Sequence, residues 1–131
     1  LIAANIDQVE PYVGSLLPLL RDRLAIPRNS PTTWVVPAGP LAAPWLTGGR
    51  KTLAIRITEH PVAAALCRAF DGPIVSTSAN LNGKSPAKTS LRVRCYFPAD
   101  RVHILGGSLG GALKPSEIRD LQTGEILRSG I

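Results

Sequence analysis

The sequence contains no methionine, not even at position 1, and aromatic residues make up only 5% of its 131 residues. A core therefore has to be built from aliphatic side chains, and an apolar content of 44% is sufficient for one. The two cysteines, Cys67 and Cys95, are far apart and lack metal-ligand spacing, so nothing demands an oxidising compartment. Cys67 lies in an apolar run, where we expect a buried free thiol.

Several motifs of common enzymes are also missing. The glycine-rich segment 106–111 lacks the lysine of a phosphate-binding loop. No nucleophile elbow supports a Ser-His-Asp hydrolase, and no His, Cys or carboxylate cluster has metal-ligand spacing. No apolar run is long enough to cross a bilayer, and no signal peptide is recognised. These absences predict a cytoplasmic protein without a membrane partner.

Basic residues outnumber acidic ones, giving a net charge of +6 and a pI near 10. This excess indicates an anionic partner such as a nucleotide, phosphate or nucleic acid, although a modestly basic soluble protein remains an alternative. A basic stripe is conceivable in one region, but the scarcity of aromatics disfavours the base stacking of single-strand binders. Its members would be Lys84, Lys88, Arg92 and Arg94.

The expected elements alternate between helix and strand along one domain. Periodicity and capping residues predict helices over residues 6–8, 15–24, 61–70 and 91–96. Asn5 is the expected cap of the first helix, and Thr89 or Ser90 is that of the last. β-branched and apolar runs predict strands over 32–36, 52–57, 74–77 and 102–105, and a terminal hairpin of 117–120 and 125–128. Residues 38–51 are expected to form a long loop. This order predicts an α/β fold with a twisted, open, mixed parallel and antiparallel sheet and flanking helices.

A polar loop follows the strand expected at 74–77. Ser76, Thr77, Ser78 and Asn80 bring three hydroxyls and an amide to the C-terminal end of that strand, where ligands collect in open α/β sheets. Hydroxyls and backbone N–H groups can surround phosphate oxygens. The same residues are ordinary turn formers. The placement after a strand favours a phosphate or nucleotide site over a plain turn.

Arg56 is the only charged residue of the strand expected at 52–57. An unpaired guanidinium is costly to bury. Arg56 therefore either grips a carboxylate bidentately or lies on the solvated face of an alternating strand. His60 is expected to cap or pack the helix that begins at Pro61, and His103 is given no role.

Three segments carry a resemblance to a known family. They are Thr52–Pro61, Gly72–Gly83 with its Ser-Thr-Ser-Ala-Asn block, and Pro115–Gly130. Together they resemble the YrdC/TsaC family, in order and through nearly the whole chain. The resemblance implies a YrdC-like domain over 1–131 that lacks its N-terminal part, because the family's Lys-x-Arg element is expected upstream of Leu1.

Members of this family are threonylcarbamoyl-AMP synthases. The resemblance implies a nucleotidyltransferase that joins L-threonine, bicarbonate and ATP into threonylcarbamoyl-adenylate and releases pyrophosphate, with Mg²⁺ on the phosphates. A partner protein would then transfer the threonylcarbamoyl group to adenosine 37 of tRNA. Such an enzyme works mainly by positioning and charge neutralisation.

The resemblance also implies the site residues, position by position. Arg56 and Ser76 would hold the threonine side of the intermediate. The residues that would line the ATP side are Thr52, Ser78, Asn80, Pro86, Ser116 and Arg128. No residue is assigned as a catalytic nucleophile or as a metal ligand. Arg56 with a carboxylate and Arg128 with a phosphate are chemically sensible pairs.

The sequence departs from the family pattern in three places, one of which is Asn82, where a serine is common. It contains no Lys-x-Arg tripeptide, so we expect weak or no turnover from these 131 residues alone. The family's Pro-Gly-Pro-x-Thr segment corresponds to residues 29–33, which keep only Pro31 and Thr33 of it.

Two alternative functions remain. The charge of +6 allows a non-catalytic RNA-binding module of the same fold. A related domain also occurs in carbamoyltransferases that mature hydrogenases, and the absence of an acylphosphatase or zinc-finger region argues against that assignment.

Overall fold

The computed structural model describes residues 1–26, 30–109, 111 and 115–130. The chain divides into two compact units, Leu1–Val75 with Ala112–Ile131 and Ser76–Gly111. Among the described residues, the first unit contains every strand, and the second contains one helix with its flanking loops.

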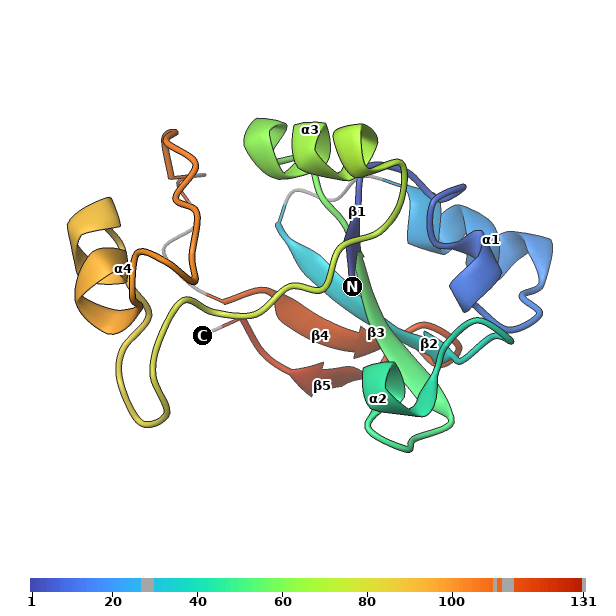
Figure 1. Cartoon of the computed structure of the whole chain (residues 1–131). Coiled ribbons are helices and arrows are strands. Elements are labelled where there is room, and N and C mark those ends of the chain that lie inside the picture. Colours follow the sequence, from blue (N-terminus) through green and yellow to red (C-terminus); the bar gives the residue numbers. More distant parts are fainter. Residues whose placement is uncertain (27–29, 110, 112–114, 131) are drawn as a thin grey trace. The chain divides into compact units, whose positions relative to one another are not determined.

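The first unit is built on a five-stranded mixed sheet (Figure 1). Its strands are β1 (Ile2–Ala3), β2 (Thr32–Pro37), β3 (Thr52–Ile57), β4 (Glu117–Asp120) and β5 (Ile126–Arg128), in the spatial order β1-β3-β2-β4-β5. β1 runs parallel to β3 and β4 parallel to β2, whereas β2 with β3 and β4 with β5 are antiparallel. The predicted α/β class with an open mixed sheet is confirmed.

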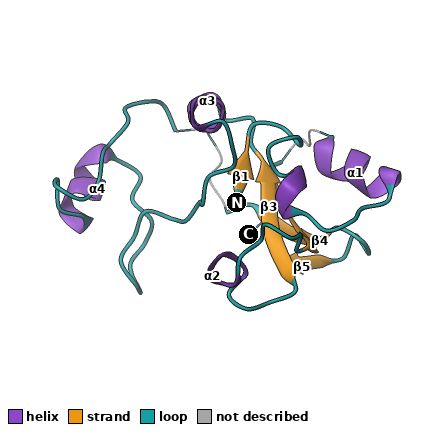
Figure 2. Cartoon of the chain, turned by 45° about the vertical axis from the view of Figure 1, so that its right-hand side comes forward, coloured by secondary structure: helices purple, strands orange, loops and turns teal. Residues whose placement is uncertain are grey.

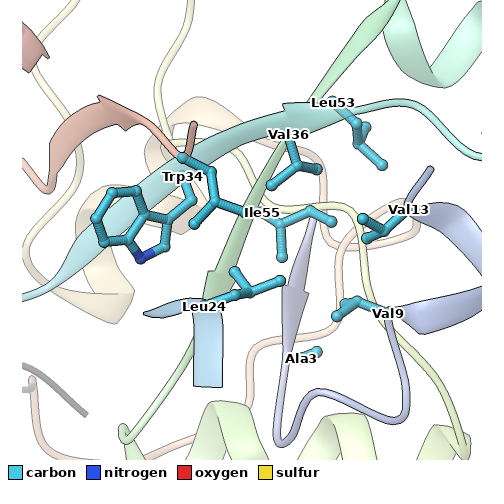
Figure 3. Close-up of a cluster of buried hydrophobic side chains, with 9 residues drawn as sticks. Ala3, Val9, Val13, Leu24, Trp34, Val36, Leu53 and Ile55 are labelled. Atoms are coloured by element: carbon cyan, nitrogen blue, oxygen red, sulfur yellow. The ribbon is translucent and has the colours of Figure 1, made fainter. Parts of the chain in front are cut away.

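One face of this sheet is covered by the hydrophobic core (Figure 3). Every second residue of β2 is buried, and on β3 the buried residues are Leu53 and Ile55. Successive side chains of a strand point to opposite faces, so this alternation gathers the buried residues on one side. The core consists of Ala3, Val9, Val13, Leu24, Trp34, Val36, Leu53, Ile55 and Leu121.

The helices of the first unit are α1 (Pro18–Ala25), α2 (Pro44–Thr47) and α3 (Pro61–Phe70), and the 3₁₀ helix η1 (Glu10–Tyr12) precedes α1. Each α-helix begins with proline, whose missing N–H costs nothing at a first helical position. α1 contributes Leu24 to the core and lies to one side of the sheet (Figure 2). α3 lies beside β1, where the thiol of Cys67 contacts the Ile2 carbonyl at 3.6 Å. Cys67 is buried, as predicted.

Backbone contacts hold the N-terminal segment to the end of β2. The Gly14 N–H donates to the Pro37 carbonyl at 2.8 Å, and the Gly39 N–H donates to the Tyr12 carbonyl at 2.8 Å. A Cβ on Gly39 would lie 2.4 Å from the carbonyl oxygen of Val13, so only glycine permits this approach. The contacts keep the segment that carries Val13 against the core.

The predicted cap at Asn5 is present, but the predicted helix over 6–8 is wrong. Asn5 Oδ1 accepts from the Gln8 N–H at 3.1 Å, and Gln8 Oε1 accepts from the Ala4 N–H at 2.8 Å. These reciprocal contacts close a turn, and helical geometry begins only at Glu10 as η1. Pro11 lacks the N–H that a longer helix would use there.

Other boundaries differ from prediction for local reasons. α1 begins at Pro18 and not at residue 15, and the loop predicted over 38–51 contains α2, which ends at Gly48 with φ of 62°. No strand forms at 102–105, and at 74–77 only Ile74 makes an isolated bridge, to Ile2. Both runs are apolar, but a strand also needs a neighbouring ladder for its backbone groups. The strands predicted from 32 and from 52, the helix over 61–70 and the terminal hairpin are confirmed.

The second unit contains α4 (Ser90–Tyr96). Thr89 caps it, because its Oγ1 accepts from the Arg92 N–H at 3.1 Å, which confirms the predicted helix and cap. The Tyr96 hydroxyl donates to the Ser85 carbonyl at 3.2 Å, and the Arg92 guanidinium lies 5.9 Å from the Tyr96 ring centroid. These contacts join α4 to the loop that precedes it.

Leu24→Ala should destabilise the protein much more than Leu19→Ala in the same helix. Leu24 is 2% exposed and Leu19 is 70% exposed. Truncating a buried leucine removes apolar contacts and leaves a cavity, at a cost of about 2–5 kcal/mol, whereas an exposed substitution changes stability by about 0.5 kcal/mol or less. Urea denaturation followed by circular dichroism measures both. Equal losses for the two variants would contradict the position of α1 over the core.

Candidate active site

The sheet face opposite the core carries predicted site residues of β3. Thr52 and Ala54 are exposed and Arg56 is half-buried, whereas Leu53 and Ile55 between them are buried. Residues two apart on a strand project from the same face. Thr52, Ala54 and Arg56 therefore form one line on this surface, which we call the open face. One of the two expectations for Arg56 was that it lies on the solvated face of an alternating strand. The structure shows this alternation.

The register of the strands extends the open face across the sheet. Thr33 falls beside Arg56 in the register of β2 with β3, and it pairs directly with Ile118 on β4. Ile118 in turn pairs with Arg128 on β5. Directly opposed residues share a face, so Arg56 and Arg128 project from the same side of the sheet. Three strand spacings separate them, which is about 14 Å at the usual spacing.

A shift in the β4–β5 register accompanies this placement of Arg128. Ile118 pairs with Arg128, but Arg119 pairs with Ile126 and not with Leu127. Leu127 is thus the additional residue of β5, and such an insertion is the signature of a β-bulge.

Ser116, another predicted ATP-side residue, is held by two neighbours of the open face. Its Oγ lies 2.8 Å from Thr33 Oγ1, and its carbonyl oxygen accepts a hydrogen bond from Arg128 Nη2 at 2.9 Å. The backbone at Gly130 also passes close, since a Cβ there would lie 3.1 Å from the Pro115 carbonyl oxygen. The structure therefore brings Ser116 and Arg128 together. Thr33 was not predicted as a site residue, although strand alternation with Val35 could have indicated its face.

Arg56 has an unusual environment for a cation. It is half-buried, and its side chain makes no hydrogen bond or ion pair with a described residue. Burial lowers the pKa of Arg56, because loss of water disfavours the charged form. By contrast, the hydrogen bond that Arg119 donates to the Glu117 carboxylate raises the pKa of Arg119. A partly desolvated guanidinium without a counter-ion favours the interpretation of Arg56 as an anion site.

The remaining predicted residues lie in the second unit. Ser76 and Ser78 are exposed, and no buried strand presents them, contrary to prediction. Asn80 Nδ2 donates to the Leu81 carbonyl at 3.1 Å, while Asn80 Oδ1 is buried and accepts no hydrogen bond from a described residue. Buried acceptors nearly always have a partner. Asn80 Oδ1 is therefore an exception among the described residues.

Backbone hydrogen bonds shape the loop that carries these residues. The Asn80 N–H donates to the Ser78 carbonyl at 3.0 Å, and the Ala87 N–H donates to the Ala79 carbonyl at 2.8 Å. The second bond closes the loop so that Pro86 lies next to its base. Gly83, at φ of 74°, forms the turn at its tip. The structure thus brings Ser78, Asn80 and Pro86 into one closed loop.

The histidine predicted to cap α3 does so. His60 Nδ1 accepts from the Ala63 N–H at 3.4 Å. Among the residues that the structure describes, no group of three or more His, Cys, Asp and Glu side chains is placed to hold a metal ion. These residues therefore do not fit a Mg²⁺ ion held by protein ligands alone. Within the same ranges, no helix has the length and apolar character needed to cross a membrane.

Comparison with known proteins places the fold in a family. The sequence model of the Sua5/YciO/YrdC family, described as "Telomere recombination", matches residues 1–130. The chain belongs to the Sua5/YciO/YrdC family. This result confirms the resemblance inferred from Thr52–Pro61, Gly72–Gly83 and Pro115–Gly130.

Curated relatives of this family member share nearly half of its residues. The proteins named threonylcarbamoyl-AMP synthase from Cellvibrio japonicus and Chromohalobacter salexigens are 49% and 48% identical to it over 128 residues. The alignments cover 98% of this chain and 68% and 69% of the two relatives. About a third of each relative thus lies outside the matched segment.

Solved Sua5 structures from P. abyssi share the fold. The complex with L-threonine matches with a TM-score of 0.82 and 26% identity, covering 98% of this chain and 38% of the Sua5 chain. A Sua5 variant with two alanine substitutions matches with a TM-score of 0.83 and 26% identity, covering 99% and 40%. This family member therefore spans about 40% of the Sua5 length.

Removing the charge of Arg56 should not lower stability, whereas removing that of Arg119 should. Arg56→Met keeps an apolar stem but deletes a partly desolvated cation that has no partner among the described residues. Arg119→Met deletes the ion pair with Glu117 and a hydrogen bond to the Gly124 carbonyl. The urea midpoints of the two variants at pH 7 give the comparison. A loss of stability in Arg56→Met as large as that in Arg119→Met would show that Arg56 has a structural partner.

Proposed function

We propose that the chain binds ATP and L-threonine as a threonylcarbamoyl-AMP synthase and, with bicarbonate, joins them into threonylcarbamoyl-adenylate with release of pyrophosphate. The observation that carries the proposal is the open face of the sheet, on which two guanidiniums stand at separate positions and neither forms an ion pair with a described residue. The reaction has anionic groups for both, a carboxylate on threonine and phosphates on ATP. The family membership and the name of the curated relatives support the same reaction.

Arg56 is proposed to bind the carboxylate of L-threonine. A guanidinium matches a carboxylate with two parallel hydrogen bonds, and the half-buried position excludes part of the competing water. A bound carboxylate would supply the counter-ion that Arg56 lacks among the described residues. The solved complex of P. abyssi Sua5 with L-threonine supports this choice of ligand. Ser76 of the second unit is assigned to the same substrate by the family resemblance.

Arg128 and Ser116 are proposed to bind ATP, together with Thr52. Arg128 keeps further N–H donors after its bond to the Ser116 carbonyl. Thr52 lies four residues from Arg56 on β3, which corresponds to about 13 Å of strand. An extended ligand that joins a threonine to a nucleotide suits this length. In the second unit, the resemblance assigns Ser78, Asn80 and Pro86 to ATP.

Ala54 is proposed to lie beneath the reacting atoms, because it separates Thr52 from Arg56. In the reaction, the threonine amine and bicarbonate condense to a carbamate with loss of water. A carbamate oxygen then attacks the α-phosphorus of ATP, the bond from that phosphorus to the oxygen bridging the β-phosphate breaks, and pyrophosphate leaves. No protein nucleophile is needed, so the side chains act by alignment and by offsetting negative charge. The small methyl group of Ala54 leaves room for this encounter on the exposed strand.

Mg²⁺ is proposed to arrive on the ATP phosphates as part of the substrate, since the described residues offer no cluster to hold it. Transfer of the threonylcarbamoyl group to tRNA is proposed to need a partner protein. ATP, threonine and tRNA meet in the cytoplasm, which we propose as the location. This sequence lacks the Lys-x-Arg element. We propose that the relatives carry it in their part outside the 128 matched residues.

Calorimetric titration of the chain with ATP, L-threonine and bicarbonate tests the proposal. Arg56→Met should weaken L-threonine binding about 10- to 100-fold, as expected for lost hydrogen bonds to a charged group, while ATP binding changes by about twofold or less. Arg50→Met loses the same charge from the exposed segment before β3 and serves as the matched control. Absence of heat with all three substrates would rule out the proposal. Unchanged threonine affinity in Arg56→Met would reassign that residue.

A second candidate, RNA binding, is favoured by one observation. The second unit, residues 76–111, contains five of the chain's 15 Lys and Arg residues but only one of its nine acidic residues. Most of the net charge of +6 therefore lies in this smaller unit. The basic residues are Lys84, Lys88, Arg92, Arg94 and Arg101.

If the second unit binds RNA, affinity for tRNA should fall steeply as salt rises. The slope of log affinity against log salt approximates the number of phosphates contacted. The double variant Lys84→Ala/Lys88→Ala should reduce that slope by about two. Filter binding between 50 and 300 mM KCl measures it, with Arg50→Met and Lys51→Met as controls in the first unit. A flat salt dependence would exclude the RNA function and leave the adenylate reaction unaffected.

A further inference from the structure

Thr33 is the polar neighbour of Arg56 within the strands of the open face. Thr33 and Arg56 are the opposed residues that follow the last pair in the register of β2 with β3. The other neighbours of Arg56 within the strands are Ile2, which pairs with it from β1, and Ala54, two residues before it on β3. Both are apolar. Within the strands, a ligand anchored at Arg56 therefore meets the hydroxyl of Thr33.

The register brings the side chains of Thr33 and Arg56 close together. The Arg56 N–H donates to the Leu1 carbonyl at 3.0 Å, which directs the backbone of Arg56 to the β1 side and away from β2. Thr33 and Arg56 thus oppose each other at a non-hydrogen-bonded position, where antiparallel side chains approach most closely, with about 4.5–5.5 Å between Cβ atoms. Both residues are half-buried.

We propose that Thr33 is a specificity residue for L-threonine, whose β-hydroxyl donates a hydrogen bond to Thr33 Oγ1 while Arg56 holds the carboxylate. The inference rests on the function proposed above. The substrate's remaining polar group, the α-amine, has to stay accessible because it becomes the carbamate nitrogen. The β-hydroxyl takes no part in the reaction, so it is the group that a binding residue can hold throughout.

The hydrogen bond of Thr33 with Ser116 leaves Thr33 able to accept a second one. Thr33 Oγ1 and Ser116 Oγ are 2.8 Å apart, and either hydroxyl can be the donor. A hydroxyl has one hydrogen and two lone pairs. If Thr33 donates, this bond leaves both of its lone pairs free, and if Thr33 accepts, it leaves one. In either direction the contact fixes Thr33 Oγ1 before a ligand arrives, and such preorganisation lowers the entropy lost on binding.

The structure of L-threonine suits the neighbours of Arg56. Its carboxylate and its β-hydroxyl are separated by only two carbon atoms, so the residue beside the carboxylate anchor is the one that meets the hydroxyl. On the other side of Thr33, Ile118 pairs with it from β4 and offers an apolar surface for the γ-methyl group. A site built around a substrate hydroxyl rejects the analogue that lacks it, because its own polar group then stays without a partner.

Calorimetric titration of the whole chain with L-threonine and with L-valine, its isostere without the hydroxyl, tests the proposal. We expect the wild type to bind L-threonine about tenfold more tightly than L-valine, as for one hydrogen bond. Thr33→Val should weaken L-threonine binding about tenfold and change L-valine binding by about twofold or less, so that the preference disappears. Thr33→Ser, which keeps a hydroxyl, should retain the preference to within about threefold.

Two controls separate recognition of the hydroxyl from a general disturbance of the sheet. L-Serine carries the same β-hydroxyl, so Thr33→Val should weaken its binding by the same factor as that of L-threonine. Thr32→Val removes a hydroxyl from the core face, where Thr32 is buried and donates to the Ser30 carbonyl. That variant should keep the preference for L-threonine over L-valine.

A wild-type chain without this preference would overturn the inference, as would an unchanged preference in Thr33→Val. Equal losses for L-threonine and L-valine would also overturn it, because they indicate a disturbed sheet. If Thr33→Val does not fold, Thr33→Ala carries the same comparison. A wild-type chain that binds no L-threonine would refute the proposed function, whereas normal wild-type binding with an unaffected Thr33→Val refutes only this inference.

Discussion

The antiparallel pairing of β2 with β3 is the constraint on which the first unit depends. Both strands bury alternate residues, and their register aligns Trp34 with Ile55 and Val36 with Leu53. Burying these side chains against α1 and the N-terminal segment supplies the main favourable free energy. Because the side-chain period of a strand is two, the same pairing necessarily leaves the intervening residues on the other face. The core and the proposed ligand site thus lie on opposite sides of two strands.

The polar groups of the sheet divide into those that are used within the fold and those that remain available. Arg119 and Asp120 are adjacent on β4, and both are used internally: Arg119 pairs with Glu117, and Asp120 Oδ1 accepts from the N–H groups of Gln122 and Thr123. Arg56 has no such partner among the described residues. A protein tolerates a partly desolvated charge only where something else compensates for it. The unsatisfied Asn80 Oδ1 in the second unit is a similar case.

The sequence predicted the strands that enclose the core, because β-branched runs such as Thr32–Val36 combine with alternation. It also predicted the proline-initiated helix α3 and the hairpin. It failed at residues 74–77 and 102–105, where apolar character suggested strands but no ladder exists to receive them. The pattern of residues indicated Arg56 and the loop Ser76–Asn80 as candidates, whereas Thr52, Pro86, Ser116 and Arg128 came from the family resemblance. The Ser116 hydroxyl contacts that of Thr33, which is 83 residues away, and no local rule reveals a contact of that separation.

The additional residue of β5 has a consequence for how this chain can vary. Leu127 is half exposed at 52%, so substitutions of its side chain should change the stability little. Its backbone is accommodated by the bulge, which lets Arg128 oppose Ile118 while Ile126 opposes Arg119. Without Leu127 the same two pairs would follow one another directly, and Arg128 would still face the side of Ile118. The bulge therefore lets β5 carry one additional residue without moving Arg128 off the open face.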